Sequence, residues 1–158
     1  PSGNDVSYFA TLDKVINQDD SEKPVPAYVQ VTDNRGSNAG WSLSVKQDEQ
    51  FKNASNKKLG KAELRLHNGT PNSANSADMA PVAEKTVVLK LDNAGNGINS
   101  KVMAAANGKG AGTWTNMFGK DVEEAVSSVE LFVPGGTQIE KGAYSTTLTW
   151  TLSADPAQ

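Results

Sequence analysis

The stretch YSTTLTWTLSADP, Tyr144–Pro156, has the strongest strand pattern in the chain. Its large apolar residues, Leu148, Trp150 and Leu152, all fall on one parity. The other parity holds only hydroxyl residues: Ser145, Thr147, Thr149, Thr151 and Ser153. Because successive side chains of a strand point to opposite faces, this segment is expected to have one apolar face and one hydroxyl face. The segment WSLSV, residues 41–45, has the same arrangement in shorter form.

Further segments with alternating or short apolar β-branched character occur along the whole chain. They are VSYFATL from Val6, AYVQVTD from Ala27, AELRLHN from Ala62, KTVVLKL from Lys85 and VELFV from Val129. Glycine, asparagine and proline separate them, and the longest separator is the polar stretch from Asn68 to Glu84. Only KDVEEAVSS after Lys120 and SKVMAAA after Ser100 are compatible with a helix. The pattern predicts an all-β fold, an antiparallel two-sheet β-sandwich, Greek-key-like, with long polar loops and at most short helices, forming one domain over residues 1–158.

The composition excludes several classes of partner and chemistry. Fifteen Lys and Arg residues stand against 18 Asp and Glu residues, for a net charge of -3, and the basic residues form no long stripe, which argues against nucleic acid. The absence of cysteine removes disulfides and thiolate sites. No apolar run is long enough to span a bilayer, so no membrane insertion is expected. The abundance of Asn, Ser, Thr, Gly and Ala favours a secreted bacterial protein.

Catalytic and metal-binding patterns are weak. The one histidine, His67, ends a predicted strand without a nucleophile motif nearby, so a surface position is expected. The sequence DNAGNGINS at Asp92 lacks the bidentate Glu of a calcium loop and is expected to form a hairpin turn. We therefore predict no metal, no cofactor and no enzymatic activity.

The two tryptophans in Trp-x-Leu segments allow two interpretations. We expect Trp41 and Trp150 to lie in the sandwich core, since a buried Trp dominates the surface it joins. The alternative is that one or both face outward and dock a protein or stack on a sugar. The hydroxyl face also has two interpretations. It is either an exposed sheet surface or a flat surface that accepts a glycan or another protein's strand.

The closing segment fits the pattern Tyr-x-x-x-Leu-Thr-Trp-x-Leu-x-x-x-Pro, and YVQVTDNRGSNAGWSLSV precedes it. Together they resemble the WxL domain of Gram-positive bacterial surface proteins. This likeness spans essentially the whole chain. The residues that match the signature are Trp41, Leu43, Tyr144, Leu148, Thr149, Trp150, Leu152 and Pro156. The resemblance implies a noncovalent, non-catalytic attachment module at the cell surface that binds the peptidoglycan-bearing wall and associates with surface partner proteins encoded alongside it.

If both tryptophans are buried, the contact surface must lie elsewhere. One candidate is an exposed apolar patch of Trp114, Met117 and Phe118, whose alternative is a lid folded onto the core. Another is the basic residues Lys57 and Lys58, with Lys52 and Lys61, which attract anionic wall polymers unless they are simply solvated. Two other functions stay open: a structural adhesin or stalk domain that makes protein contacts without binding the wall, and a wall-active hydrolase.

Overall fold

The computed structural model describes residues 3–16, 18–19 and 21–155, and these form strands joined by turns and two single-turn helices. The strands are β1 Val6–Phe9, β2 Asp13–Ile16, β3 Glu22–Val25, β4 Tyr28–Asp33, β5 Trp41–Gln47, β6 Glu63–His67, β7 Gly69–Asn72, β8 Val82–Ala83, β9 Thr86–Leu89, β10 Ser100–Ala105, β11 Gly112–Phe118, β12 Val129–Val133 and β13 Leu148–Ser153. The helices are η1 Ala77–Met79 and α1 Val122–Ala125.

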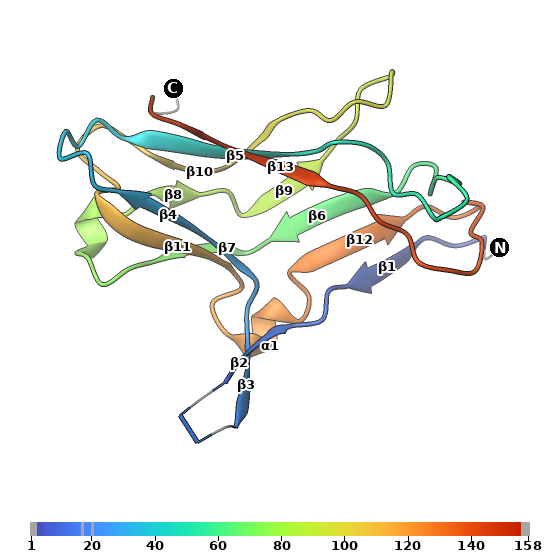
Figure 1. The fold of residues 1–158 in the computed structure, drawn as a ribbon, viewed down its shortest axis with the longest axis horizontal. Coiled ribbons are helices and arrows are strands. Elements are labelled where there is room, and N and C mark those ends of the chain that lie inside the picture. The colour runs from blue at the N-terminus through green and yellow to red at the C-terminus, as the bar shows by residue number, and fades with distance from the viewer. Residues whose placement is uncertain (1–2, 17, 20, 156–158) are drawn as a thin grey trace.

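The strands form two packed layers (Figure 1). One layer is a sheet with the order β13-β5-β10-β8, and the other contains the sheets β4-β11-β7 and β1-β12-β6-β9. These two sheets are joined because β6 continues into β7 through Asn68, whose positive φ of 61° bends the chain. The ribbon β2-β3 extends away from the layers. All pairings are antiparallel, and the predicted all-β sandwich is confirmed.

The core forms where β5 faces the opposite layer. Trp41, Leu43 and Val45 of β5 are buried, while Ser42 and Ser44 are only half-buried, as the alternation predicts. The other buried members of this cluster come from both layers: Val31, Leu66, Val87, Leu89, Val102, Met103, Ala105, Trp114 and Phe118. Burial of these side chains is the main favourable contribution to folding.

One helix-compatible segment is a strand instead. SKVMAAA forms β10, which pairs with β5 on one side and β8 on the other. Its pairing with β5 shifts register between Lys101 and Met103, so the neighbouring residues Val102 and Met103 are both buried. A bulge of this kind breaks the alternation that reveals a strand in the sequence, and the alanine-rich end disguises it further. The polar stretch from Asn68 to Glu84 likewise contains β7, η1 and β8.

Two local expectations are confirmed. KDVEEAVSS contains α1, and Asp121 caps it by accepting a hydrogen bond from the backbone N–H of Glu124 at 2.9 Å. The loop at Asp92 is a tight turn in which the backbone N–H of Asp92 donates to the carbonyl of Asn96 at 2.8 Å. Both segments connect strands at the rim of the sandwich.

Replacing Trp41 with alanine is expected to destabilise the domain by about 3–5 kcal/mol, because a fully buried aromatic side chain is lost from the core. The matched variant Trp150→Ala should cost no more than about 2 kcal/mol, because over a third of that residue is already exposed. Urea unfolding of both variants checks this pair. Equal losses of unfolding free energy would contradict the difference in burial between Trp41 and Trp150.

Candidate functional site

Trp41 is enclosed at one end of the core. It is 1% exposed, and its indole N–H donates to the carbonyl of Gly110 at 3.0 Å. A Cβ at Gly110 would lie 2.6 Å from the indole nitrogen, and the φ of this residue is +77°, so the position requires glycine. As predicted, Trp41 is a core residue.

The prediction of an exposed apolar patch formed by Trp114, Met117 and Phe118 is wrong. These residues belong to β11, the middle strand of the sheet β4-β11-β7. Trp114 is 2% exposed and donates its indole N–H to the carbonyl of Ala111, Phe118 is buried, and Met117 is half-buried. Glycines precede and follow this segment in the sequence, and they mark the ends of a central strand. The alternative, a lid folded onto the core, correctly predicts that Trp114 is buried, but the segment is a central strand and not a lid.

The expectation that Trp150 lies in the core is also wrong. Trp150 is 38% exposed and Leu152 is 53% exposed, whereas Leu148 is half-buried. These three side chains lie on the core side of the sheet, since Trp150 is paired with Val45 and Leu152 with Leu43. Because β13 is the edge strand, this face extends past the part of the sandwich that the opposite layer covers.

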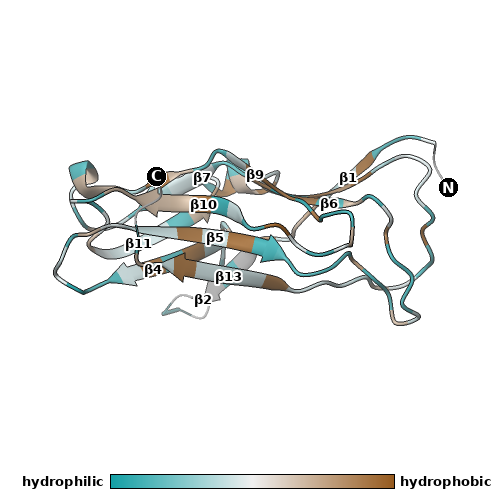
Figure 2. Ribbon diagram, turned by 90° about the horizontal axis from the view of Figure 1, so that it is seen from above, coloured by the Kyte–Doolittle hydropathy of each residue, from teal (hydrophilic) through white to brown (hydrophobic). Residues whose placement is uncertain are grey.

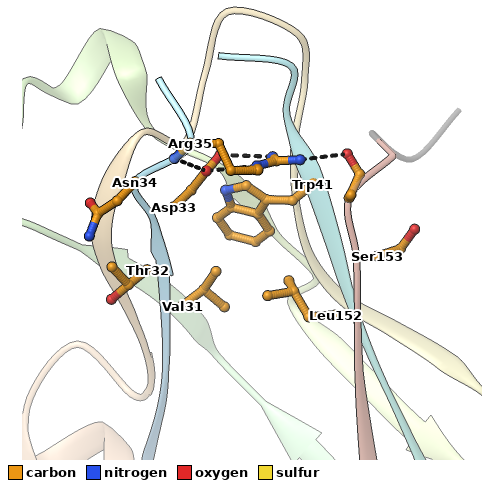
Figure 3. A pocket seen from close by; sticks show the side chains of 9 residues that line it. Val31, Thr32, Asp33, Asn34, Arg35, Trp41, Leu152 and Ser153 are labelled. Atoms are coloured by element: carbon orange, nitrogen blue, oxygen red, sulfur yellow. Dashed lines mark hydrogen bonds and ion pairs between the residues drawn. The ribbon is translucent and has the colours of Figure 1, made fainter. Parts of the chain in front are cut away.

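A small groove lies where β13 approaches β4. It has a volume of about 210 Å³ and is lined by Val31–Arg35, Trp41 and Leu152–Ala154. Figure 3 shows Val31, Trp41 and Leu152 directed toward the same space. We call this space the end groove. Its apolar floor and polar rim allow contact with an amphipathic group.

An ion pair closes the rim of the end groove. The Arg35 guanidinium donates to Asp33 at 2.8 Å and reaches across to the carbonyl of Ala154 at 3.3 Å (Figure 3). It also donates to the carbonyl of Gly40 at 2.7 Å. The hydrogen bonds from Arg35 lower the pKa of Asp33 to about 2. This pair links the β4–β5 turn to the end of β13.

Comparison with known families gives a match over residues 2–156 to the WxL domain, described as surface cell wall-binding. The chain belongs to the WxL family. It is therefore a cell-surface domain of a family that binds the cell wall and is not a family of enzymes. Comparisons with curated proteins and with solved structures give no match.

The other signature residues of this WxL domain hold β13 in place. Tyr144 packs on a second apolar cluster and accepts a hydrogen bond from the backbone N–H of Glu140 at 2.9 Å. The hydroxyl of Thr149 donates to Asp48 at 2.7 Å, on the face opposite Trp150. Pro156 lies outside the described residues. Thr149 thus attaches β13 to the residue that follows β5, and Tyr144 holds the segment before β13 on the second apolar cluster, while Trp150 and Leu152 stay accessible.

The lysines of the β5–β6 loop lie at the end of the sandwich that also contains the start of the chain (Figure 1). Lys58, Lys61 and Lys90 line a hollow of about 690 Å³, and the first two also line a second hollow of about 390 Å³. We call these three residues and Lys57 the lysine end. None of the four forms an ion pair with another described residue. Asp92 and Glu63 lie on the same rim.

The loop that contains the lysines has a defined structure. Gln50 is buried and donates to the carbonyls of Gly60 and Ala62 at 2.8 and 3.1 Å. Asn53 accepts backbone hydrogen bonds within the loop, and Leu59 is buried beneath it. The lysine ammonium groups are thus attached to an ordered backbone, which lowers the entropy lost when they bind an anion.

His67 ends β6 as predicted, and it is half-buried. Its Nε2 lies 2.9 Å from Glu130 and its Nδ1 lies 3.3 Å from the hydroxyl of Thr86. Glu130 also accepts a hydrogen bond from the hydroxyl of Ser7 at 2.5 Å. The hydrogen bonds from Ser7 and His67 lower the pKa of Glu130. The cluster joins β1, β12 and β6, so it stabilises the sheet.

Among residues 3–16, 18–19 and 21–155, no group of three His, Asp or Glu side chains could hold a metal ion. Within the same residues, neither helix has the length or the apolar character needed to cross a bilayer.

Acrylamide is expected to quench Trp150 but not Trp41 or Trp114, because only the indole of Trp150 is exposed. The variant Trp150→Phe should remove the quenchable fraction of the fluorescence. In the control Trp114→Phe that fraction should remain. A quenchable Trp114 would contradict its burial in β11.

Acid should weaken the rim of the end groove. The pKa of Asp33 is lowered to about 2, below the usual value near 3.8. The stability due to this carboxylate is therefore complete above about pH 4 and is lost as the pH falls through about 2. Between about pH 5 and 2, the melting temperature of the Asp33→Asn variant should therefore fall less than that of the wild type. Arg35→Gln should flatten the acid dependence in the same way, and an unchanged slope in both variants would exclude the pair as its source.

Proposed function

We propose that residues 1–158 form a single domain that holds its parent protein noncovalently on the peptidoglycan-bearing wall of a Gram-positive bacterium. The lysine end is the proposed contact surface, and the domain acts without catalysis or a cofactor. Membership of a surface cell wall-binding family supports the target. The observation that supports the surface is the set of four lysines without ion-pair partners among the described residues, three of which border a hollow of about 690 Å³.

The charge of the lysine end suits a wall ligand. Peptidoglycan stems contain carboxylates, and attached wall polymers contain phosphates. Of the two acidic residues on the rim of the larger hollow, Glu63 is already engaged by Arg65 at 3.2 Å, which leaves Asp92. Exposed ammonium groups attract anions over roughly 10 Å at moderate salt. Attachment of this kind is reversible and weakens as salt increases.

The wild-type domain should sediment with isolated Gram-positive sacculi at micromolar concentration. The variant Lys58→Glu with Lys61→Glu should bind at least about tenfold more weakly, because repulsion replaces attraction at both hollows. The matched control Lys23→Glu with Lys120→Glu changes the net charge equally, away from the lysine end, and should bind like the wild type. Bound and free protein are measured over a range of salt concentrations.

Sacculi stripped of phosphodiester-linked polymers provide a second arm. Loss of binding on stripping would identify the anionic polymer as the ligand, and retained binding would identify peptidoglycan. If the Lys58 and Lys61 variant binds as well as the control does, the lysine end is not the contact. If the wild type binds neither preparation, the remaining function is that of a structural adhesin or stalk domain.

A second candidate function is contact with a surface partner protein encoded nearby. The exposed apolar side chains of Trp150 and Leu152 favour it, because interface cores are enriched in Trp. Mixing the domain with the purified ectodomain of that protein, with Trp150→Ser as the variant and Thr151→Ser as the control, tests this function. Binding that Trp150→Ser does not weaken would exclude β13 as the contact.

A further inference from the structure

β13 is an edge strand without the usual protection. It pairs with β5 on one side only, and its pairing register is continuous from Leu148 to Ser153. Natural edges are commonly protected by charge, proline or a bulge. Here β7 contains Pro71, and Lys85 and Lys90 flank β9. β13 has no charged residue and no proline, and Figure 2 shows it beside β5 without strongly hydrophilic colour.

The open side of β13 exposes the backbone of its apolar residues. The carbonyl of Thr147 accepts from the backbone N–H of Asp48 at 2.9 Å, so the backbone groups of Thr147 point toward β5. Backbone direction alternates along an antiparallel strand. The N–H and C=O groups of Leu148, Trp150 and Leu152 therefore point away from β5, toward the open side.

The sequence of this edge is a palindrome. Leu148, Thr149, Trp150, Thr151 and Leu152 give the same order of residues in both directions. If two copies are aligned antiparallel with Trp150 opposite Trp150, each Leu lies opposite a Leu and each Thr opposite a Thr. The three pairs of apolar residues would each exchange N–H to C=O hydrogen bonds in both directions.

We propose that β13 pairs with β13 of a second copy of this chain about a two-fold axis through Trp150. The two sheets β13-β5-β10-β8 then join into one continuous sheet. On the core side of the joined sheet, Trp150 then lies beside Trp150 of the second copy, and Leu152 lies beside Leu148 of the second copy. Such an interface uses the same surface on both copies, as two-fold symmetry requires.

A second copy suits this edge better than an unrelated strand does. The match extends over both faces, since the threonine pairs fall together on the hydroxyl face. The hydroxyl of Thr149 donates to Asp48, so its oxygen stays able to accept from Thr151 of the second copy. The chain has a net charge of -3, but none of the side chains of β13 is charged, so no like charges lie directly opposite each other in this register. The proposal does not depend on wall attachment.

The dimer is expected to be reversible. One strand pair buries less than the roughly 800 Å² per partner of a standard interface, so a dissociation constant in the micromolar range or weaker is expected. Sedimentation equilibrium from micromolar to millimolar concentration should show the mass increasing from 16.7 kDa toward twice that value.

Leu152→Lys places a charge on the core side of the edge and should keep the protein monomeric at every concentration. The control Val82→Lys places the same charge on β8, at the opposite edge of the same sheet, where the side chain is 75% exposed, and it should dimerise like the wild type. Thermal unfolding confirms that both variants are folded. A wild type that stays at 16.7 kDa up to millimolar concentration overturns the proposal, and so does a Leu152→Lys variant that dimerises fully.

Cysteine pairs test the register on a chain that has no cysteine of its own. Opposed residues without mutual backbone bonds lie about 4.5 Å apart at Cα, within the range of a disulfide. Oxidation of Thr149→Cys mixed with Thr151→Cys should therefore give disulfide-linked dimers more rapidly than either variant alone. Equal crosslinking in all three samples would exclude the palindromic register, and capture of a foreign strand with no self-association would exclude the dimer.

Discussion

The fold depends on the enclosure of Trp41 at the start of β5. Its indole fills the end of the core, and its N–H satisfies the carbonyl of Gly110, which no other residue type could bring so close. This contact holds the 106–111 loop against β5, and backbone pairing places β5 between β10 and β13. Since β5 supplies the register for both neighbours, the position of β13 and of the end groove follows from it.

The two Trp-x-Leu segments have the same alternation and different surroundings. Trp41 belongs to an interior strand, so the opposite layer covers it. Trp150 belongs to an edge strand, where the same inward direction leaves it 38% exposed. Side-chain direction could be predicted from the sequence because it depends on parity alone. Exposure could not, because it depends on the order of strands in the sheet, which involves residues distant in the sequence.

The same distinction explains the other differences between prediction and structure. β4, β5, β6 and β13 were predictable because their alternation is regular. β10 was not, because its bulge places two buried residues in succession, and β11 was disguised by the glycines at its ends. The lysine residues could be identified from the sequence as a basic loop. The arrangement of Lys58 and Lys61 beside the distant Lys90 required the folded chain.

The pairing of β13 with β5 also has a mechanical consequence. Both strands run roughly along the longest dimension of the domain, and the described chain starts and finishes at opposite ends (Figure 1). A pull between those ends loads the hydrogen bonds of the pair in parallel, along the strand direction, so they must yield together. Peeling β13 sideways would break them one at a time at much lower force. The geometry of this pair therefore resists tension along the length of the domain far better than it resists peeling.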